Sequence, residues 1–237
     1  MTYLSQLSAG ANELTLKRKK EYIRFNFGSV INDRLRQKSC SILEIGPGLG
    51  EFIAYCNDYG VASIDIIDYE KEVLDYVCRK FKIRNQFISQ NIELIEKKLK
   101  TYDVIVMTQV FEHIPKEKHI PYLQMLYAHL NKKGVILITV PNIGNPLAIY
   151  ERYYDYTHET AFTEHSLLQM IDFAQLTDSK VRVQAFKIPT YNLVNSIRFC
   201  LQFFLHGLFK ILFMINGGVY PKILTTNITL FIEKGVK

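Results

Sequence analysis

The feature that most constrains the fold is a glycine-rich turn set between an apolar strand and a helix, with the sequence LEIGPGLGEF over residues 43–52. The apolar run 41–45 predicts a buried strand. After the turn, Phe52, Ile53 and Cys56 share one face of a helical pattern. A strand, a glycine turn and a helix in this order are typical of an open α/β sheet, which binds ligands at the carboxyl ends of its strands.

The spacing of the glycines separates two classes of ligand. A dinucleotide fingerprint, G-x-G-x-x-G/A, would have its last glycine or alanine at position 51, but this chain has Glu51, whose carboxylate would repel a pyrophosphate. The pattern E-x-G-x-G-x-G, from Glu44 to Gly50, instead resembles motif I of the class I S-adenosylmethionine-dependent methyltransferases. In that family the loop wraps the methionine part of the cofactor. A glycine turn without a ligand is the alternative.

Composition supports one folded domain with a sizeable core. The chain has 237 residues, of which 48% are hydrophobic and 22% charged. A net charge of +6 favours an anionic partner, such as nucleic acid, an acidic membrane surface or an anionic glycan. The charge is scattered, and we interpret its one dense run, residues 17–20, as a solvated helix face. We therefore expect no specific nucleic acid partner.

The spacing of the cysteines bears on metal binding, and the N-terminal sequence bears on the cellular location. The four cysteines, Cys40, Cys56, Cys78 and Cys200, show no metal-ligand spacing. We interpret them as reduced, buried thiols, and we expect no metal site. The N-terminus has no continuous apolar segment typical of a signal peptide. Together these features indicate a cytoplasmic protein.

Predicted strands and helices alternate along the chain. After a helical lead-in over 1–38, which packs either on the sheet edge or over the cofactor, strands are expected at 41–45, 61–67, 86–91, 102–107, 135–140, 180–188 and 223–233. Helices are expected from 52, at 69–81, at 121–130 and from an N-cap at Thr163 to 173, with a turn at 131–134. This order implies right-handed crossovers and a doubly wound, mostly parallel sheet.

The resemblance implies a Rossmann-like sheet of seven strands in a single domain, 1–237. Within it we expect a lead-in over 1–38, a cofactor-binding core with a substrate loop over 39–190, an apolar helical insertion over 191–218 and the last strand within 219–237. The resemblance covers residues 40–190 well. It implies S-adenosylmethionine as the cofactor and a methyl transfer reaction.

Several residues are then expected to bind the cofactor. Glu44, Gly46, Gly48 and Gly50 belong to motif I. Asp68, at the end of the second strand, matches the ribose-binding position better than Asp65 does, although Asp is also a favoured helix N-cap.

Two further positions follow later strands. Asn91 stands where the family often has an Asp near the adenine, and it is also a common turn residue. Gln109 lies in the segment TQVFEHIP, which resembles the family's loop beside the sulfonium.

Candidate catalytic residues come from two segments. His113 follows Glu112 in the loop after the fourth strand. Asp155 and His158 lie in ERYYDYTHETAFTEHSL, residues 151–167, which resembles a segment of methyltransferases in sugar and cell-surface polysaccharide pathways. A neutral imidazole can take a hydroxyl proton near pH 7. We rank His158 before His113 because its segment faces the acceptor, with Asp155 orienting it or binding a sugar hydroxyl. Capping and loop-fixing roles are the alternatives.

The stretch 193–215 is mostly Leu, Ile and Phe, with a polar stripe of Asn195, Arg198, Gln202, His206 and Lys210. Its apolar circumference is wider than a core stripe, and charge interrupts it too often for an ordinary spanning helix. A helix lying in the plane of a membrane, a homodimer interface and a lid over the substrate are all consistent with it.

The function expected from these features is S-adenosylmethionine-dependent transfer of a methyl group to a hydroxyl of a sugar or lipid-linked glycan, by an O-methyltransferase at the inner face of the membrane. A quinone or lipid headgroup is an alternative acceptor. A non-catalytic protein of this fold in a membrane-associated assembly is a second alternative. An NAD-linked oxidoreductase or epimerase is a third, which Glu51 argues against.

Overall fold

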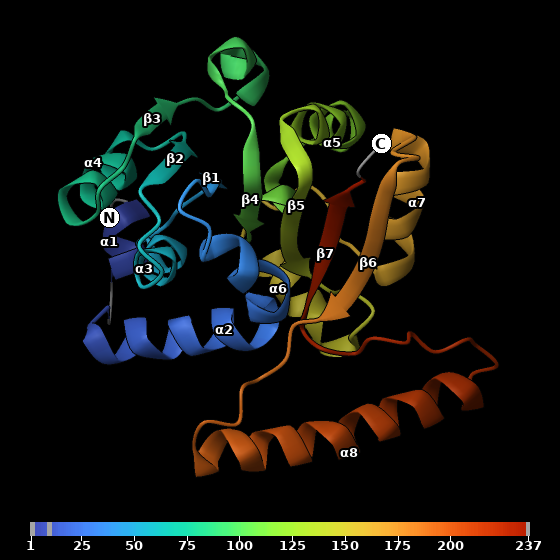
Figure 1. Ribbon diagram of the computed structural model, residues 1–237. Coiled ribbons are helices and arrows are strands. Elements are labelled where there is room, and N and C mark those ends of the chain that lie inside the picture. The colour runs from blue at the N-terminus through green and yellow to red at the C-terminus, as the bar shows by residue number, and fades with distance from the viewer. Residues whose placement is uncertain (1–2, 9–10, 236–237) are drawn as a thin grey trace.

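The computed structural model describes residues 3–8 and 11–235, and its centre is one seven-stranded sheet (Figure 1). The strand order is β3-β2-β1-β4-β5-β7-β6. The strands are β1 Ser41–Ile45, β2 Ser63–Asp68, β3 Asn85–Ile88, β4 Tyr102–Thr108, β5 Leu130–Pro141, β6 Ser179–Ala185 and β7 Asn227–Lys234. The first five pair in parallel, and β7 pairs antiparallel with both β5 and β6. The expected doubly wound, mostly parallel sheet is confirmed.

Helices cover both faces of the sheet. One face carries α2 Glu13–Leu35, α3 Glu51–Asn57 and α4 Lys71–Lys80, and the other carries the 3-10 helix η1 Ile92–Lys98, α5 His119–Ala128 and α7 Glu164–Ala174. Alternate residues of β4 divide between the two cores: Val104 and Val106 face the first, and Ile105 and Met107 face the second. This alternation is why the strands read as continuous apolar runs.

Shorter elements complete the fold. They are α1 Tyr3–Ser8, the 3-10 helices η2 Phe111–His113, η3 Lys116–Lys118 and η4 Pro146–Ala148, and α6 Ile149–Tyr154. Thr163 is the N-cap of α7, as expected, and forms a capping box with Ser166. The lead-in α2 both packs on the sheet, through Phe27 against Phe231, and lines the central cavity. The helix therefore covers a face of the sheet rather than its edge, since β7 lies between β5 and β6, and it reaches the cavity where the cofactor was expected.

Two local expectations are wrong. Residues 131–134 lie inside β5 rather than in a separate turn, and they bulge because Tyr102 pairs with Leu130 whereas Val104 pairs with Val135. Lys133 takes a positive φ of 62° there. Of the four thiols expected to be buried, Cys78 is only half-buried and Cys200 is exposed, the latter because it lies on α8, which the core does not cover.

Helix α8, Leu193–Ile215, lies outside the two helix layers (Figure 1, orange). Its bounds are those expected from the sequence. It is long and apolar enough to cross a membrane, with a mean hydropathy of 1.5 and only 6% of its most apolar 18-residue window buried. The most exposed positions include Leu193, Phe203, Phe204 and Ile215.

Candidate active site

A cavity of about 1160 Å³ opens at the carboxyl ends of β1, β2 and β4. This is the edge where open α/β sheets bind their ligands. Its walls come from the glycine loop, the residues after β2 and β4, the N-terminal half of α2 and the segment after α6. A small-molecule site usually measures about 300–1000 Å³, so this cavity has room for a cofactor and part of an acceptor.

The glycine loop needs its glycines for different reasons. Gly46 and Gly50 have φ of 71° and 82°, and a Cβ there would come within 2.3 Å of Val110 Cγ2 and 2.5 Å of the Phe81 ring. Gly48 has φ of 53°, but a Cβ there would approach only Glu51 Oε2, at 3.8 Å. Gly46 and Gly48 line the cavity and Gly50 does not. Packing therefore explains Gly46 and Gly50, whereas Gly48 leaves open space in which a ligand fits.

Glu44 is buried at the base of the loop and also lines the cavity. Its Oε2 makes no hydrogen bond within the described part of the chain. Burial, followed by the nearby Glu51 carboxylate, raises the pKa of Glu44 well above its usual value. An unpaired buried carboxylate oxygen is costly, and an ammonium group in the cavity would offset that cost. The methionine part of S-adenosylmethionine carries such a group, so the residues fit this cofactor.

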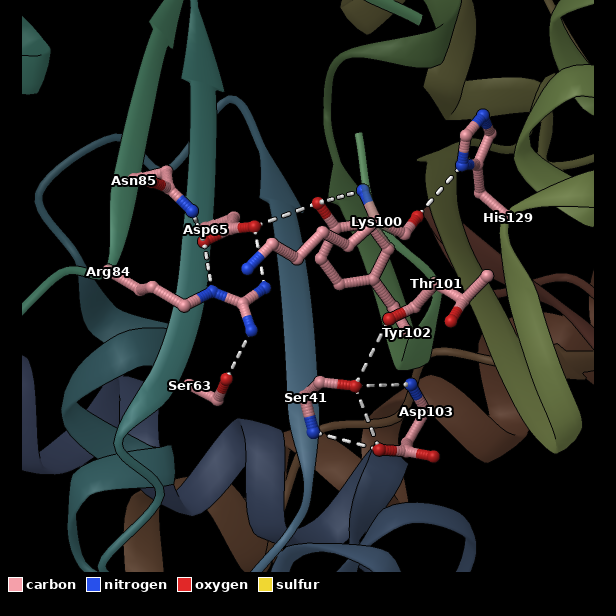
Figure 2. A network of polar contacts seen from close by, with 10 residues as sticks. All are labelled: Ser41, Ser63, Asp65, Arg84, Asn85, Lys100, Thr101, Tyr102, Asp103 and His129. Carbon is pink, nitrogen blue, oxygen red and sulfur yellow. Dashed lines mark hydrogen bonds and ion pairs between the residues drawn. The ribbon is translucent and has the colours of Figure 1, made fainter. Parts of the chain in front are cut away.

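The two acidic residues of β2 have separate surroundings. Asp68 lines the cavity and is 7% exposed, and its Oδ1 accepts the Glu70 N–H at 2.9 Å. Burial raises its pKa. Asp65 belongs to an internal network instead (Figure 2): it accepts from Arg84 Nε at 2.8 Å and from the Tyr102 hydroxyl at 2.8 Å. Asp68 is therefore the acid of this strand that a ligand in the cavity can reach.

Gln109 and Asn91 line the cavity, and each also makes a hydrogen bond that stabilises the local backbone. Gln109 has φ of 55°, which costs a residue other than glycine about 1–2 kcal/mol. Its Nε2 donates to Asn227 Oδ1 at 3.0 Å, fixing the end of β4 to the start of β7. Asn91 is the N-cap of η1 and accepts the Glu93 N–H at 3.3 Å. Asn91 therefore has the turn-forming role that the sequence allowed, and it also lines the cavity.

Glu112, His113 and His158 form a cluster at one side of the cavity. Their potential ligand atoms lie within 4.8 Å of one another, and the two imidazole centroids are 4.7 Å apart. His113 lines the cavity, and His158 stands against its ring without being part of the wall. Glu112 is 1% exposed, and neither carboxylate oxygen has a hydrogen-bond partner among the described residues. Burial raises its pKa to about 8.

A short relay fixes the proton of His113. The Thr157 hydroxyl donates to Asp155 Oδ1 at 2.7 Å, so its oxygen must accept from His113 Nδ1, 2.9 Å away. Burial, followed by the neighbouring His158, lowers the pKa of His113. The hydrogen bonds from Thr157 outweigh burial and lower the pKa of Asp155. Asp155 was expected to orient His158 or to bind a sugar hydroxyl; its hydrogen bond through Thr157 leads to His113 rather than to His158, and the sugar contact stays a prediction.

Tyr22, Phe186 and Lys19 are among the cavity-lining residues that were not predicted from the sequence. Tyr22 and Phe186 line the cavity with their rings stacked at a centroid separation of 6.0 Å. Lys19 forms an ion pair with Glu51 at the edge of the glycine loop. Tyr22 and Phe186 are 164 positions apart in the sequence, so no local pattern could have joined them. Lys19 belongs to the basic run, whose charge was the only signal.

Comparisons with known proteins agree with this geometry. The chain matches the family model described as "Methyltransferase domain" over residues 14–180. An S-adenosylmethionine-dependent methyltransferase from Archaeoglobus fulgidus is 19% identical, with a TM-score of 0.65 over 98% of this chain and 100% of that one. The plantazolicin methyltransferase BpumL in complex with SAH is 16% identical, with a TM-score of 0.60 over 98% of this chain and 93% of that one. No curated protein matches significantly.

The chain belongs to the methyltransferase-domain family, because the family model covers more than half of it. Its fold is that of the class I methyltransferases, as the sequence indicated. S-adenosylmethionine is accordingly its cofactor, and the protein is a methyltransferase.

Proposed function

We propose that the protein transfers a methyl group to a hydroxyl of a sugar or lipid-linked glycan at the inner face of a membrane, as an O-methyltransferase. The observation that carries this proposal is the position of one cavity between three features. The glycine loop and Asp68 lie at one end, the histidine cluster lies at the side, and residues adjoining α8 form part of the wall. In this proposal the methyl donor, the proton acceptor and a helix that faces the membrane would lie close together.

Three residues at one end of the cavity are available to bind S-adenosylmethionine. Glu44 offers its unpaired Oε2 to the ammonium group, Gly48 leaves the space for the methionine part, and Asp68 retains lone pairs for the ribose hydroxyls. When bound, S-adenosylmethionine supplies a methyl carbon on a positively charged sulfur, which leaves with the electron pair of the broken bond. The cavity holds both reactants close together, which is the largest contribution to such a transfer.

Removal of the acceptor's proton is assigned to the cluster of Glu112, His113 and His158. A sugar hydroxyl is a weak nucleophile near pH 7 and needs a group that takes or releases its proton. Nδ1 of His158 lies 2.8 Å from the Glu151 carbonyl oxygen, which can only accept, so this nitrogen carries the hydrogen. The other nitrogen of each imidazole therefore keeps its lone pair. In the simplest form, a histidine is the base.

A glycan acceptor is supported by the segment after α6. Asp155, Tyr156, Thr157 and Glu159 line the cavity and supply the hydroxyl, carboxylate and aromatic groups that bind sugars. Tyr156 is fully exposed, and three tyrosines on α6 are also exposed, at 65–76%. Of these tyrosines Tyr156 lines the cavity, where an aromatic ring with a polar tip suits a ligand with apolar faces and hydroxyl edges.

The membrane proposal follows from the orientation of α8. Most of its polar stripe faces inward: Asn195 is buried and Gln202, His206 and Lys210 are half-buried, whereas Arg198 is exposed. Most apolar side chains face outward, with Phe203 73% and Phe204 72% exposed, whereas Phe209 is buried. A helix that turns its apolar side away from its own domain presents far more apolar area than a soluble surface normally does.

Charge favours an anionic lipid surface as the partner of α8. Residues 179–232 contain six Lys and Arg residues and no Asp or Glu. Basic residues near such a surface each contribute about 1 kcal/mol to binding. The start of α8 is fixed beside the cavity, where Asn195 contacts Tyr22. A helix lying in the headgroup region would therefore hold the cavity near a lipid-linked acceptor.

A quinone or lipid headgroup is the second candidate acceptor, and the outward apolar face of α8 favours it. The test uses labelled S-adenosylmethionine with native membranes, with soluble sugars and with extracted quinones. Methyl label on a lipid that releases a methylated sugar after mild acid supports the glycan. Label on intact quinone or headgroup supports the second candidate. Binding of the donor without any transfer would favour a non-catalytic role.

Flotation with vesicles of phosphatidylcholine and phosphatidylglycerol tests the membrane surface. The wild type should rise with the vesicles, and a variant with Phe203, Phe204 and Leu208 changed to Ser should not. The matched control changes Leu94 of η1 and Phe173 of α7 to Ser. These side chains are 79% and 71% exposed but lie outside α8. A wild type that stays down as a discrete dimer, broken by the triple change, would make α8 a homodimer interface. A wild type that stays down as a monomer would contradict both.

A further inference from the structure

We propose that Glu112, His113 and His158 bind a divalent transition-metal ion beside the acceptor. From the sequence we expected no metal site, because His158 is 45 positions from His113 and the three residues follow no local ligand motif. The fold brings them together: the carbonyl oxygen of Glu112 accepts the N–H groups of Glu159 at 2.8 Å and Thr160 at 3.1 Å. These bonds join the segment after β4 to the segment after α6.

The carboxylate is the first observation that points to a cation. Glu112 is 1% exposed, and both of its oxygens lack a hydrogen-bond partner within residues 3–8 and 11–235. A buried carboxylate without partners is costly, and buried charges are usually paired or coordinate a metal. One of its oxygens lies within 4.8 Å of a nitrogen of each histidine. The cluster therefore contains an acceptor group that the protein itself leaves unsatisfied.

The histidines are the second observation. His158 Nδ1 donates to the Glu151 carbonyl at 2.8 Å, and His113 Nδ1 donates to the Thr157 hydroxyl at 2.9 Å. Metal-binding histidines almost always donate their other ring nitrogen in this way, which fixes the tautomer and the ring orientation. Asp155 supports the arrangement by accepting from the same Thr157 hydroxyl at 2.7 Å.

The donor set decides the class of cation. Two imidazoles and one carboxylate suit Zn²⁺, Fe²⁺ and Co²⁺ better than Mg²⁺, which prefers oxygen ligands. Ligands at about 2.0–2.1 Å from one ion stand at most about 4.2 Å apart, so side-chain rotation must bring the widest pair closer. Three protein ligands leave coordination positions of the ion open. Because His113 lines the cavity, an acceptor in the cavity could reach such a position.

The inference deepens the proposed function, on which its catalytic meaning rests. A hydroxyl that binds an open position of a divalent cation has a lowered pKa, so its proton can pass to solvent water. The oxygen then forms the bond to the methyl carbon, and the electron pair of the carbon–sulfur bond stays on sulfur. In this form the histidines hold the cation and do not take the proton themselves.

Titration of the metal-free full chain with Co²⁺ alone tests the site, because the visible absorption of Co²⁺ reports its ligands. The wild type should bind one ion per chain. His113→Ala and His158→Ala should each weaken binding at least tenfold, and Glu112→Gln should do the same if it folds. Thr157→Val should weaken binding 10–100-fold by freeing the His113 ring. His165→Ala, an exposed histidine on α7, is the matched control.

The outcomes separate this inference from the proposed function. No stoichiometric Co²⁺ binding, or binding that His113→Ala and His158→Ala leave unchanged in folded protein, would overturn the metal site. Binding of several Co²⁺ ions per chain, equal in the wild type and in every variant, would indicate only adventitious ions and would also overturn it. Because neither donor nor acceptor is present, a protein that binds Co²⁺ as expected but transfers no methyl group would contradict the proposed function alone.

Discussion

Replacing Asp68 with alanine should weaken binding of S-adenosylhomocysteine, the stable product form of the cofactor. The Asp68 carboxylate is 7% exposed and gives one lone pair to Glu70, which leaves others for the ribose hydroxyls. Hydrogen bonds to a charged group contribute about 1.5–3 kcal/mol each. Loss of one or two, partly replaced by water, corresponds to about 2–4 kcal/mol, or a roughly 30- to 1000-fold higher Kd. Isothermal titration calorimetry measures this directly.

Two further variants separate the ribose contact from other effects. Asp68→Asn keeps an oxygen that can accept the Glu70 N–H, so it preserves the local turn while removing the charge. Glu72→Ala removes an exposed carboxylate from the first turn of α4. It controls for the loss of a negative charge near Asp68 without loss of the ribose contact. A Kd for Asp68→Ala within threefold of the wild type, with unchanged circular dichroism, would refute the ribose-binding assignment.

Three other expectations follow from the same structure. Gly48→Ala places a Cβ in open cavity space at φ 53°, so binding of S-adenosylhomocysteine should fall at least tenfold in calorimetry while the melting temperature falls by only a few degrees. Asp65→Asn breaks a buried ion pair and should cost about 3–5 kcal/mol at pH 7 in denaturant unfolding. His113→Ala and His158→Ala should each lower kcat by roughly 10²–10⁴-fold without changing cofactor affinity, whereas a loss confined to KM would indicate acceptor binding.

The pH dependence of the Asp65 variant has a definite sign. Burial opposes ionisation of Asp65, but hydrogen bonds from Arg84, Tyr102 and Asn85 outweigh it and lower the pKa of Asp65 below its usual value. A lowered pKa stabilises the fold at every pH above about 4, and this contribution disappears as the pH falls through the folded-state value. The difference in unfolding free energy between wild type and Asp65→Asn should therefore shrink below pH 4. A constant difference from pH 7 to pH 2 would contradict this reasoning.

Local patterns were sufficient for most of the fold. The apolar run of β1 and the bounds of α8 were predicted to the residue, because burial on both sheet faces and an unbroken apolar helix leave plain signals. The antiparallel insertion of β7 between β5 and β6 was not predicted, since strand order depends on long-range pairing. The bulge at 131–134 looked like a turn because its Asn, Lys and Gly residues favour both.

The site was predicted unevenly. Glu44, Gly46 and Gly48 of motif I reach the cavity wall, as do Asp68 and Gln109, because the order of strands already places their loops at one sheet edge. Gly50 does not reach the wall, since it packs against Phe81. The Asp155–Thr157–His113 relay joins residues up to 44 positions apart, and no local pattern in the sequence indicates it. The side of α8 that the domain covers was not predicted: all of the polar stripe except Arg198 faces the domain, and only the three-dimensional packing could establish this.

The most direct test of the proposed reaction is transfer of labelled methyl from S-adenosylmethionine to native membranes by purified full-length protein. The wild type should place label on a lipid-extractable product that yields an O-methylated sugar on hydrolysis, and Asp68→Ala should transfer at most a tenth as much at the same donor concentration. Absence of label from every membrane fraction at saturating donor, or label that Asp68→Ala transfers as fast as the wild type, would contradict it.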